Sequence, residues 1–91
     1  MFRIADTIRA TTTADGGILM DVHRGQMFCL NAVGAQIVEL MQQGYDESRI
    51  ADEISRRYDA EKETVRADVV EFINALQKHH VVKSVRNGKL T

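Results

Sequence analysis

Residues 15–31 read DGGILMDVHRGQMFCLN, and this stretch decides the expected fold. It opens with Asp15-Gly16-Gly17, a turn composition that tolerates positive φ. Two short apolar runs follow, separated by His23-Arg24-Gly25, whose glycine suits the left-handed position of a bulged hairpin loop. Two such runs around a short loop predict a β-hairpin with strands over about 18–22 and 26–30.

A three-residue loop gives this hairpin the pairs Val22–Gln26, Met20–Phe28 and Ile18–Leu30. Side chains alternate along a strand, so these residues share the face turned to the core. Asp21 falls on the opposite face, toward solvent, with Leu19, Met27 and Cys29. The pattern therefore predicts a sheet with one face packed on helices and the other largely open.

The flanking segments complete an α+β pattern. Residues 7–13 are rich in β-branched residues and predict a first strand, which makes the sheet three-stranded and antiparallel. Apolar residues then recur at helical spacing over about 32–43, 47–58 and 61–79. We expect one domain over residues 1–91, resembling a winged helix-turn-helix, in which a three-stranded antiparallel sheet is followed by three helices.

Signals for the helix ends support these bounds. Asn31 and Asp46 stand where the first two helices begin and are good N-caps, and Gly44 ends the first helix. The third helix has acidic residues in its first turn and a basic end at Lys78-His79, as the helix dipole prefers. Residues 81–85 predict a short extended tail, followed by a turn at 87–88.

Composition excludes several classes of protein. The chain has 91 residues, 12 basic and 13 acidic side chains and a net charge of −1, whereas nucleic-acid binders normally carry a basic surplus. Its apolar runs are too short to span a bilayer, and the first ten residues lack the hydrophobic core of a secretory signal. A single cysteine cannot form an internal disulfide. We therefore expect a cytoplasmic protein.

None of the reactive side chains forms a convincing catalytic or metal site. The carboxylates between residues 59 and 71 are explained by a solvated helix face. Cys29 stands without the signature of a thiol nucleophile and is better read as a small packing residue. His79 and His80 are adjacent, so on a helix they point about 100° apart and cannot readily share an ion. We expect no enzyme, no cofactor and no metal.

The third strand, Gln26–Leu30, is the informative feature, because it lies at an edge of the predicted meander. It holds no Lys, no Pro and no inward charge, which are the usual protections of a free edge. Something is therefore expected to cover it: the third helix, a dimer partner or a peptide strand. The predicted register turns the N–H groups of Met27 and Cys29 outward, toward that cover.

The sequence resembles the PqqD family. The resemblance rests on an ordered pattern that covers nearly the whole chain from Ile18 to Val82: Leu19-Met20-Asp21, Gly25, Leu30-Asn31, Gly34-Ala35, Ile37, Leu40, Gly44, Ile50, Tyr58, Asp68-Val69 and Leu76. Residues 30–35 make it most similar to the free-standing leader-binding proteins of lasso-peptide pathways. It departs from the family at Val38, where relatives often carry an aromatic residue, and it lacks the Pro-Glu element of many quinone-cofactor pathway members.

The resemblance implies a function. Family members, also called precursor-peptide recognition elements, bind the leader of a ribosomally made precursor as an added strand between the third strand and the third helix. Such a protein delivers the precursor to processing enzymes, here a separate leader peptidase of the transglutaminase-like type and a cyclase. Strand addition draws affinity from main-chain hydrogen bonds and selectivity from side-chain pockets.

We expect the binding site on the third strand and on one flank of the third helix. The candidate residues are Gln26, Met27, Phe28, Cys29, Leu30, Val65, Asp68, Val69, Phe72 and Ala75. Phe28 is expected to floor the groove, and Asp68 either meets a basic or hydroxyl-bearing leader side chain or is a solvated helix charge. Two other functions stay open: a winged-helix DNA-binding regulator, and an oligomerisation module that uses the same edge.

Overall fold

The computed structural model describes residues 2–84. In chain order the elements are β1 (Phe2–Ile4), β2 (Ile8–Thr13), β3 (Gly16–Asp21), β4 (Gln26–Leu30), α1 (Ala32–Gln42), α2 (Glu47–Tyr58), α3 (Lys62–Lys78) and β5 (Val82–Ser84). The predicted α+β class, with an antiparallel three-stranded sheet followed by three helices, is confirmed. Strand β1 was not predicted, and β5 lies within the extended tail predicted over 81–85.

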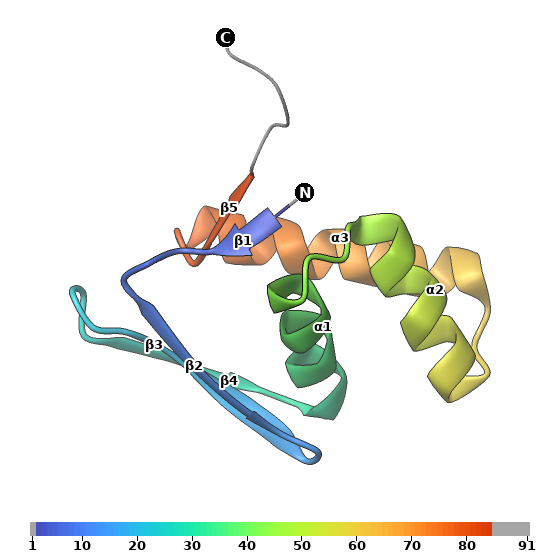
Figure 1. Ribbon diagram of the computed structural model, residues 1–91, viewed down its shortest axis with the longest axis horizontal. Helices are drawn as coiled ribbons and strands as arrows, with labels where there is room; N and C mark the ends of the chain where they lie inside the picture. Colours follow the sequence, from blue (N-terminus) through green and yellow to red (C-terminus); the bar gives the residue numbers. More distant parts are fainter. Residues whose placement is uncertain (1, 85–91) are drawn as a thin grey trace, which may run out of the picture.

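The three-stranded sheet has the order β2-β3-β4, so that β2 and β4 are its two edges. Figure 1 shows α1 between this sheet and α2, with α3 running along the molecule from α2 to the pair of short strands. The inner face of the sheet packs on α1 through Leu19, which is fully buried. Within residues 2–84, the other face is covered by no helix (Figure 1).

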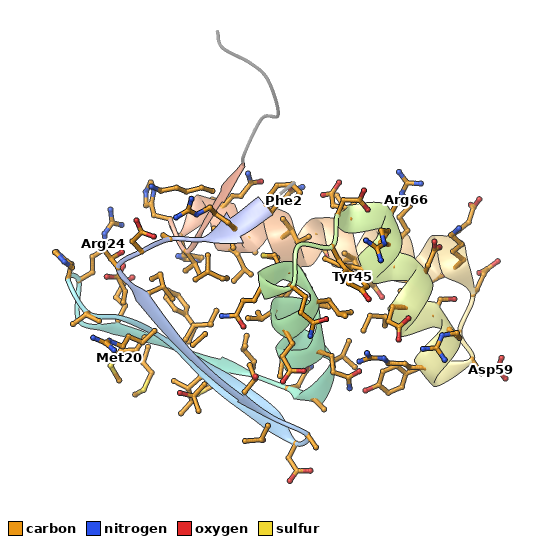
Figure 2. All side chains as sticks on the ribbon, viewed as in Figure 1. Phe2, Met20, Arg24, Tyr45, Asp59 and Arg66 are labelled. Carbon is orange, nitrogen blue, oxygen red and sulfur yellow. The ribbon has the colours of Figure 1, made fainter. Side chains whose placement is uncertain are left out.

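The predicted register of the β3–β4 hairpin is wrong by one residue. Leu19 pairs with Phe28, and Met20 pairs with Met27. Asp21 is therefore turned to the inner face, where it is only 2% exposed, instead of to solvent. Conversely, Ile18, Met20 and Val22 lie on the open face with exposures of 42%, 44% and 55%. Figure 2 shows Met20 pointing away from the helices.

Hydrogen bonds to Asp21 explain the shift. Its Oδ1 accepts the N–H groups of His23, at 3.1 Å, and of Arg24, at 3.0 Å. Its carbonyl accepts the N–H of Gly25 at 2.8 Å, and Gly25 has a φ of 66°. Asp21 thus closes a loop of four residues, 22–25, where three were expected. A buried carboxylate is tolerated when its oxygens accept such hydrogen bonds.

A second, two-stranded sheet joins the ends of the described chain. Phe2 pairs with Ser84 and Ile4 pairs with Val82, in antiparallel register. The extended tail predicted over 81–85 thus becomes β5 up to Ser84, while Val85 and the turn predicted at 87–88 lie outside the described residues. Val81 and Val82 are buried in the core.

The helices begin and end as the sequence indicates. Asn31 Oδ1 accepts the Gly34 N–H at 2.8 Å, and Asp46 Oδ1 accepts the Arg49 N–H at 2.9 Å, which are the two predicted N-caps. Gly44 has a φ of 94° and lets the chain turn away from α1. Buried apolar side chains of all three helices and β3 form one core. No helix within residues 2–84 is long and apolar enough to cross a membrane.

Candidate functional site

Hydrogen bonds at the closed end of the β3–β4 hairpin show toward which neighbouring strand each backbone group of β3 points. The Asp21 carbonyl accepts the N–H of Gly25 and is therefore turned away from β2. The next residue, Val22, points the other way and donates its N–H to the carbonyl of Thr7, at 3.2 Å. Backbone groups alternate in this manner along both strands.

Strand β4 consequently presents a free edge. The partners of Asp21 and Leu19 on β4 are Gln26 and Phe28, which turn their N–H and C=O groups toward β3. Met27 and Cys29 lie between them in sequence, so their N–H and C=O groups point away from the sheet. The observed register thus gives these two residues the outward direction that was expected, although the strand partners differ.

An apolar groove lies beside this edge. Its first part, called here the strand pocket, has a volume of about 320 Å³ and lies where β4, α1 and α3 meet. The residues that line it are Cys29, Leu30, Asn31, Val33, Gly34, Ile37, Asp68 and Phe72. A Cβ on Gly34 would lie 3.3 Å from Asn31 Oδ1 and 3.4 Å from Cε1 and Cζ of Phe72, so the Phe72 ring lies close to this turn of α1.

The groove continues past the end of β4 toward α2. Its second part, called here the helix pocket, has a volume of about 200 Å³ and is bounded by α1, α3 and the C-terminal end of α2. The residues that line it are Val33, Ile37, Ile54, Tyr58, Ala60, Val65, Asp68 and Val69. The two pockets share Val33, Ile37 and Asp68, so they adjoin, and together they are called here the groove.

Asp68 is the one charged side chain among the residues that line this groove. It lies on α3, where the two pockets meet, and it is exposed. Within residues 2–84, no salt bridge involves its carboxylate. The groove therefore offers a hydrogen-bond acceptor with a negative charge amid apolar walls.

The structure places the predicted site residues in two groups. Those that line the groove are Cys29, Leu30, Val65, Asp68, Val69 and Phe72. Gln26 and Met27 are exposed along the free edge of β4, and Ala75 is exposed on α3, outside both pockets. Phe28 is half-buried and lies against His79, with ring centroids 5.4 Å apart, instead of forming the floor of a pocket.

Sequence reasoning missed the contributions of α1 and α2 to the groove. Val33 and Tyr58 were not among the candidate residues, and they are 36% and 46% exposed. Both line the helix pocket. Gly34 was noticed only as part of the family pattern. Exposed apolar residues near helix ends were the available signal, but which of them share a groove depends on how the helices pack.

No three His, Cys, Asp or Glu side chains within residues 2–84 gather as a metal site requires. A wider hollow of about 750 Å³ is lined by α3 alone, from Lys62 to Asn74, and is an open helix flank. The groove beside β4 differs from this flank, because β4, α1, α2 and α3 all contribute to its walls.

Comparison with known proteins gives one matching family and two similar folds. The family model described as coenzyme PQQ synthesis protein D (PqqD) matches residues 16–82. The fold is similar to that of the chain described as "TbiB1 in Complex with the TbiA(beta) Leader Peptide", with a TM-score of 0.84 and 27% identity over 93% of this chain and 99% of that one.

A second similar fold is that of "Lasso peptide synthetase B1 complexed with the leader peptide", with a TM-score of 0.83 and 23% identity over 91% of this chain and 98% of that one. No curated protein sequence gives a significant match. Since the family model covers well over half of the sequence, the chain belongs to the PqqD family.

Proposed function

We propose that this protein binds the leader segment of a ribosomally made precursor peptide as an added strand on β4, beside α3. The observation that carries the proposal is the position of an apolar groove directly next to the free edge of β4. A peptide strand there extends the sheet and exchanges hydrogen bonds with Met27 and Cys29. Its inward side chains enter the groove, because strand side chains alternate.

The comparisons support a peptide as the ligand. Both similar folds are described as bound to leader peptides, and one of them is at 27% identity over nearly its full length. The proposed role is that of an adaptor without chemistry of its own. It acts in the cytoplasm, where the precursor is made, and presents the precursor to a separate leader peptidase of the transglutaminase-like type and to a cyclase.

The two parts of the site have different tasks in this proposal. Backbone groups of β4 bind any extended peptide, and each hydrogen bond contributes about 0.5–1.5 kcal/mol. The groove selects among peptides, because apolar side chains that fill it leave water. Asp68 adds a preference for a leader side chain that donates a hydrogen bond or carries a positive charge.

A direct test uses a fluorescein-labelled synthetic leader from the precursor encoded next to this protein's gene. We expect micromolar or tighter binding by fluorescence polarisation, and no binding of the core segment of the same precursor. In ¹⁵N spectra the amides of Met27 and Cys29 should shift and become protected from exchange, while those of the β2 edge should not. Binding without these changes argues against strand addition at β4.

The same preparation tests the two rival functions. A DNA gel shift at several salt concentrations should show no salt-dependent complex, since basic and acidic residues nearly balance. Sedimentation at several concentrations should show a mass independent of concentration. A DNA complex of ordinary regulatory affinity, or self-association through β4 that the leader does not displace, would replace the proposed function.

A further inference from the structure

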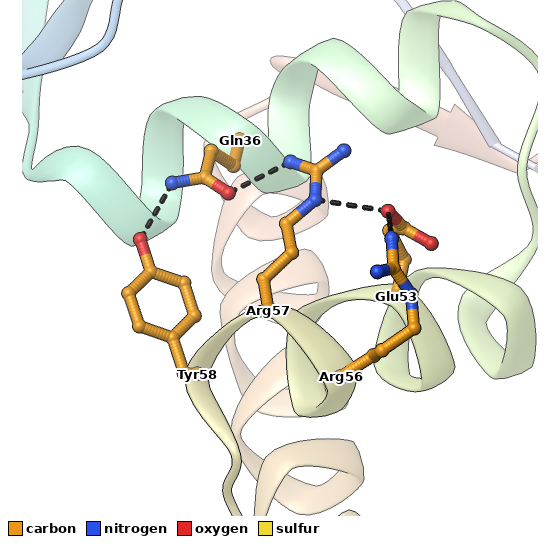
Figure 3. A network of polar contacts seen from close by, with 5 residues as sticks. All are labelled: Gln36, Glu53, Arg56, Arg57 and Tyr58. Atoms are coloured by element: carbon orange, nitrogen blue, oxygen red, sulfur yellow. Dashed lines mark hydrogen bonds and ion pairs between the residues drawn. The ribbon is translucent and has the colours of Figure 1, made fainter.

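A chain of polar contacts links α1 and α2 at the rim of the helix pocket (Figure 3). Gln36 of α1 donates its amide N–H to the Tyr58 hydroxyl at 2.5 Å and accepts from Arg57 at 2.8 Å. Arg57 also donates to Glu53 at 2.9 Å, and Arg56 contacts the same carboxylate. Its members are called here the Tyr58 network: Gln36, Glu53, Arg56, Arg57 and Tyr58.

The network includes Tyr58, whose side chain remains partly exposed in the folded protein. Tyr58 is the last residue of α2, and the chain turns away at once through Asp59, which has a φ of 50°. The Tyr58 ring is 46% exposed and is one wall of the helix pocket. The hydrogen bond from Gln36 holds the hydroxyl end of this side chain against α1.

We propose that the helix pocket is a second subsite for one apolar side chain of the bound leader, and that Tyr58, positioned by its network, determines which side chain fits. This inference rests on the proposed function and extends it to a segment of the leader beyond the strand-paired part. Tyr58 is a specificity-determining residue, and Gln36 and Arg57 are positioning residues.

Because β4 is short, only part of the leader can pair with it, and the part beyond can reach this subsite. The strand ends at Leu30, and the chain turns into α1 after the Asn31 cap, so the free edge is five residues long. This edge pairs with roughly 17 Å of peptide. A longer leader leaves the edge beside Leu30 and passes Asp68, which lines both pockets. The helix pocket is the next hollow on that path.

The size and walls of the pocket indicate what it accepts. Its volume of about 200 Å³ is below the range of about 300–1,000 Å³ typical of small-molecule sites, so a single side chain suits it better than a separate ligand. Its walls include Ile54, Val65 and Val69, and its charged group, Asp68, lies at the end that faces β4. An aliphatic or aromatic side chain is the matching occupant.

A purely structural role for the network predicts a different outcome. Its members are largely at the surface, where ion pairs and hydrogen bonds contribute little to folding. If the network only linked α1 to α2, its removal would alter the melting temperature slightly and would affect all peptides alike. If it positions Tyr58, its removal affects only those leaders that reach the helix pocket.

The test combines variants of the protein with truncations of the labelled leader. Wild type is first titrated with leaders shortened from each end, to find the truncation that weakens binding while strand pairing persists in ¹⁵N spectra. Tyr58→Ala should bind the full leader about tenfold more weakly than wild type and should no longer distinguish it from that truncation. Arg66→Ala, on the α3 flank outside the groove, should bind both peptides as wild type does.

Two further variants distinguish the contribution of the Tyr58 ring from the contribution of its positioning by Gln36. Tyr58→Phe keeps the wall but loses the contact with Gln36, and Gln36→Ala frees an intact tyrosine. Each should weaken binding of the full leader about threefold and leave the truncated leader unaffected. Wild-type binding by both would overturn the positioning role, and wild-type binding by folded Tyr58→Ala would overturn the subsite. Failure of wild type to bind any leader would instead overturn the proposed function.

Discussion

Cys29 of β4 lies directly opposite Ile18 of β3, and the two residues form a pair whose backbone groups point away from each other. The N–H and C=O of Cys29 therefore face the free edge, while its side chain stands with Ile18 on the open face of the sheet. Cys29 also lines the strand pocket. A change at this one residue can thus test the backbone and the side chain separately.

Replacing Cys29 with proline should abolish most of the leader affinity without unfolding the protein. Proline removes the outward N–H at an edge position where it is tolerated. The lost hydrogen bond costs about 0.5–1.5 kcal/mol of binding free energy. The leader carbonyl is then left without a donor and the proline ring clashes with the peptide, so the total loss rises to about 3 kcal/mol, or about a hundredfold in Kd. Fluorescence polarisation gives the Kd, and the melting temperature reports folding.

Two variants serve as controls for this change. Cys29→Ala keeps the N–H and should bind almost as wild type does. Ala10→Pro removes an outward N–H from the opposite edge, because Arg9 and Thr11 face β3 and Ala10 does not. It should also leave binding intact. A folded Cys29→Pro variant with wild-type affinity would refute strand addition at β4.

Asp68 can be tested against a matched carboxylate on the same helix. We expect Asp68→Ala to weaken leader binding by about fivefold to tenfold, because a leader donor loses its charged acceptor. The melting temperature should stay nearly constant, since Asp68 is exposed. Glu71→Ala removes an equal charge from the flank outside the groove and should change neither quantity. Equal effects of both variants would mean that only net charge matters.

Phe72 should affect stability and binding together. Its ring is half-buried against the core and also lines the strand pocket. We expect Phe72→Ala to lower the free energy of unfolding by about 2 kcal/mol, somewhat less than for a fully buried ring. Leader affinity should fall as well. Phe72→Leu restores most of the apolar volume and should recover stability in urea titrations more completely than binding, which depends on the flat ring.

The Tyr58 network predicts a pH dependence. Hydrogen bonds from Arg56 and Arg57 lower the pKa of Glu53 below its usual value of 4.5. The folded state thus favours the carboxylate, and the resulting stability is fully present above pH 4.5 and lost as the pH falls through the lowered pKa. Wild type should therefore exceed Glu53→Gln in urea midpoint at pH 7 and lose that advantage as the pH falls below the lowered pKa. A constant difference would contradict this.

The sequence was sufficient for the three-stranded sheet and the three helices, but not for β1 or for the register of the hairpin. Asn31, Asp46 and Gly44 act within one helical turn of themselves, so local reasoning could place the helix ends. The hairpin register depended on whether Val22 or Asp21 closed the loop. Period-two patterning favoured a solvated aspartate, whereas the loop N–H groups of His23 and Arg24 drew the carboxylate inward.

For the candidate site too, local patterns predicted some residues, whereas the packing of the helices determined the others. A helical wheel placed Asp68 and Phe72 on one flank of α3, and both line the groove. The wheel also included Ala75, which lies outside both pockets, because α3 extends past the groove toward His79. The contributions of Val33 and Tyr58 arise from the packing of α1 and α2 on α3, which no pattern within a single helix encodes.

The β1–β5 pair has a consequence for how this fold can be used. Phe2 and Ser84 are Cα partners, so the described chain enters and leaves the fold at one place, and neither strand lines the groove. Neighbouring ends are what circular permutation and domain insertion require. The whole domain can therefore be grafted into a surface loop of a catalytic protein, entering and leaving the host at a single point, with the groove beside β4 still open.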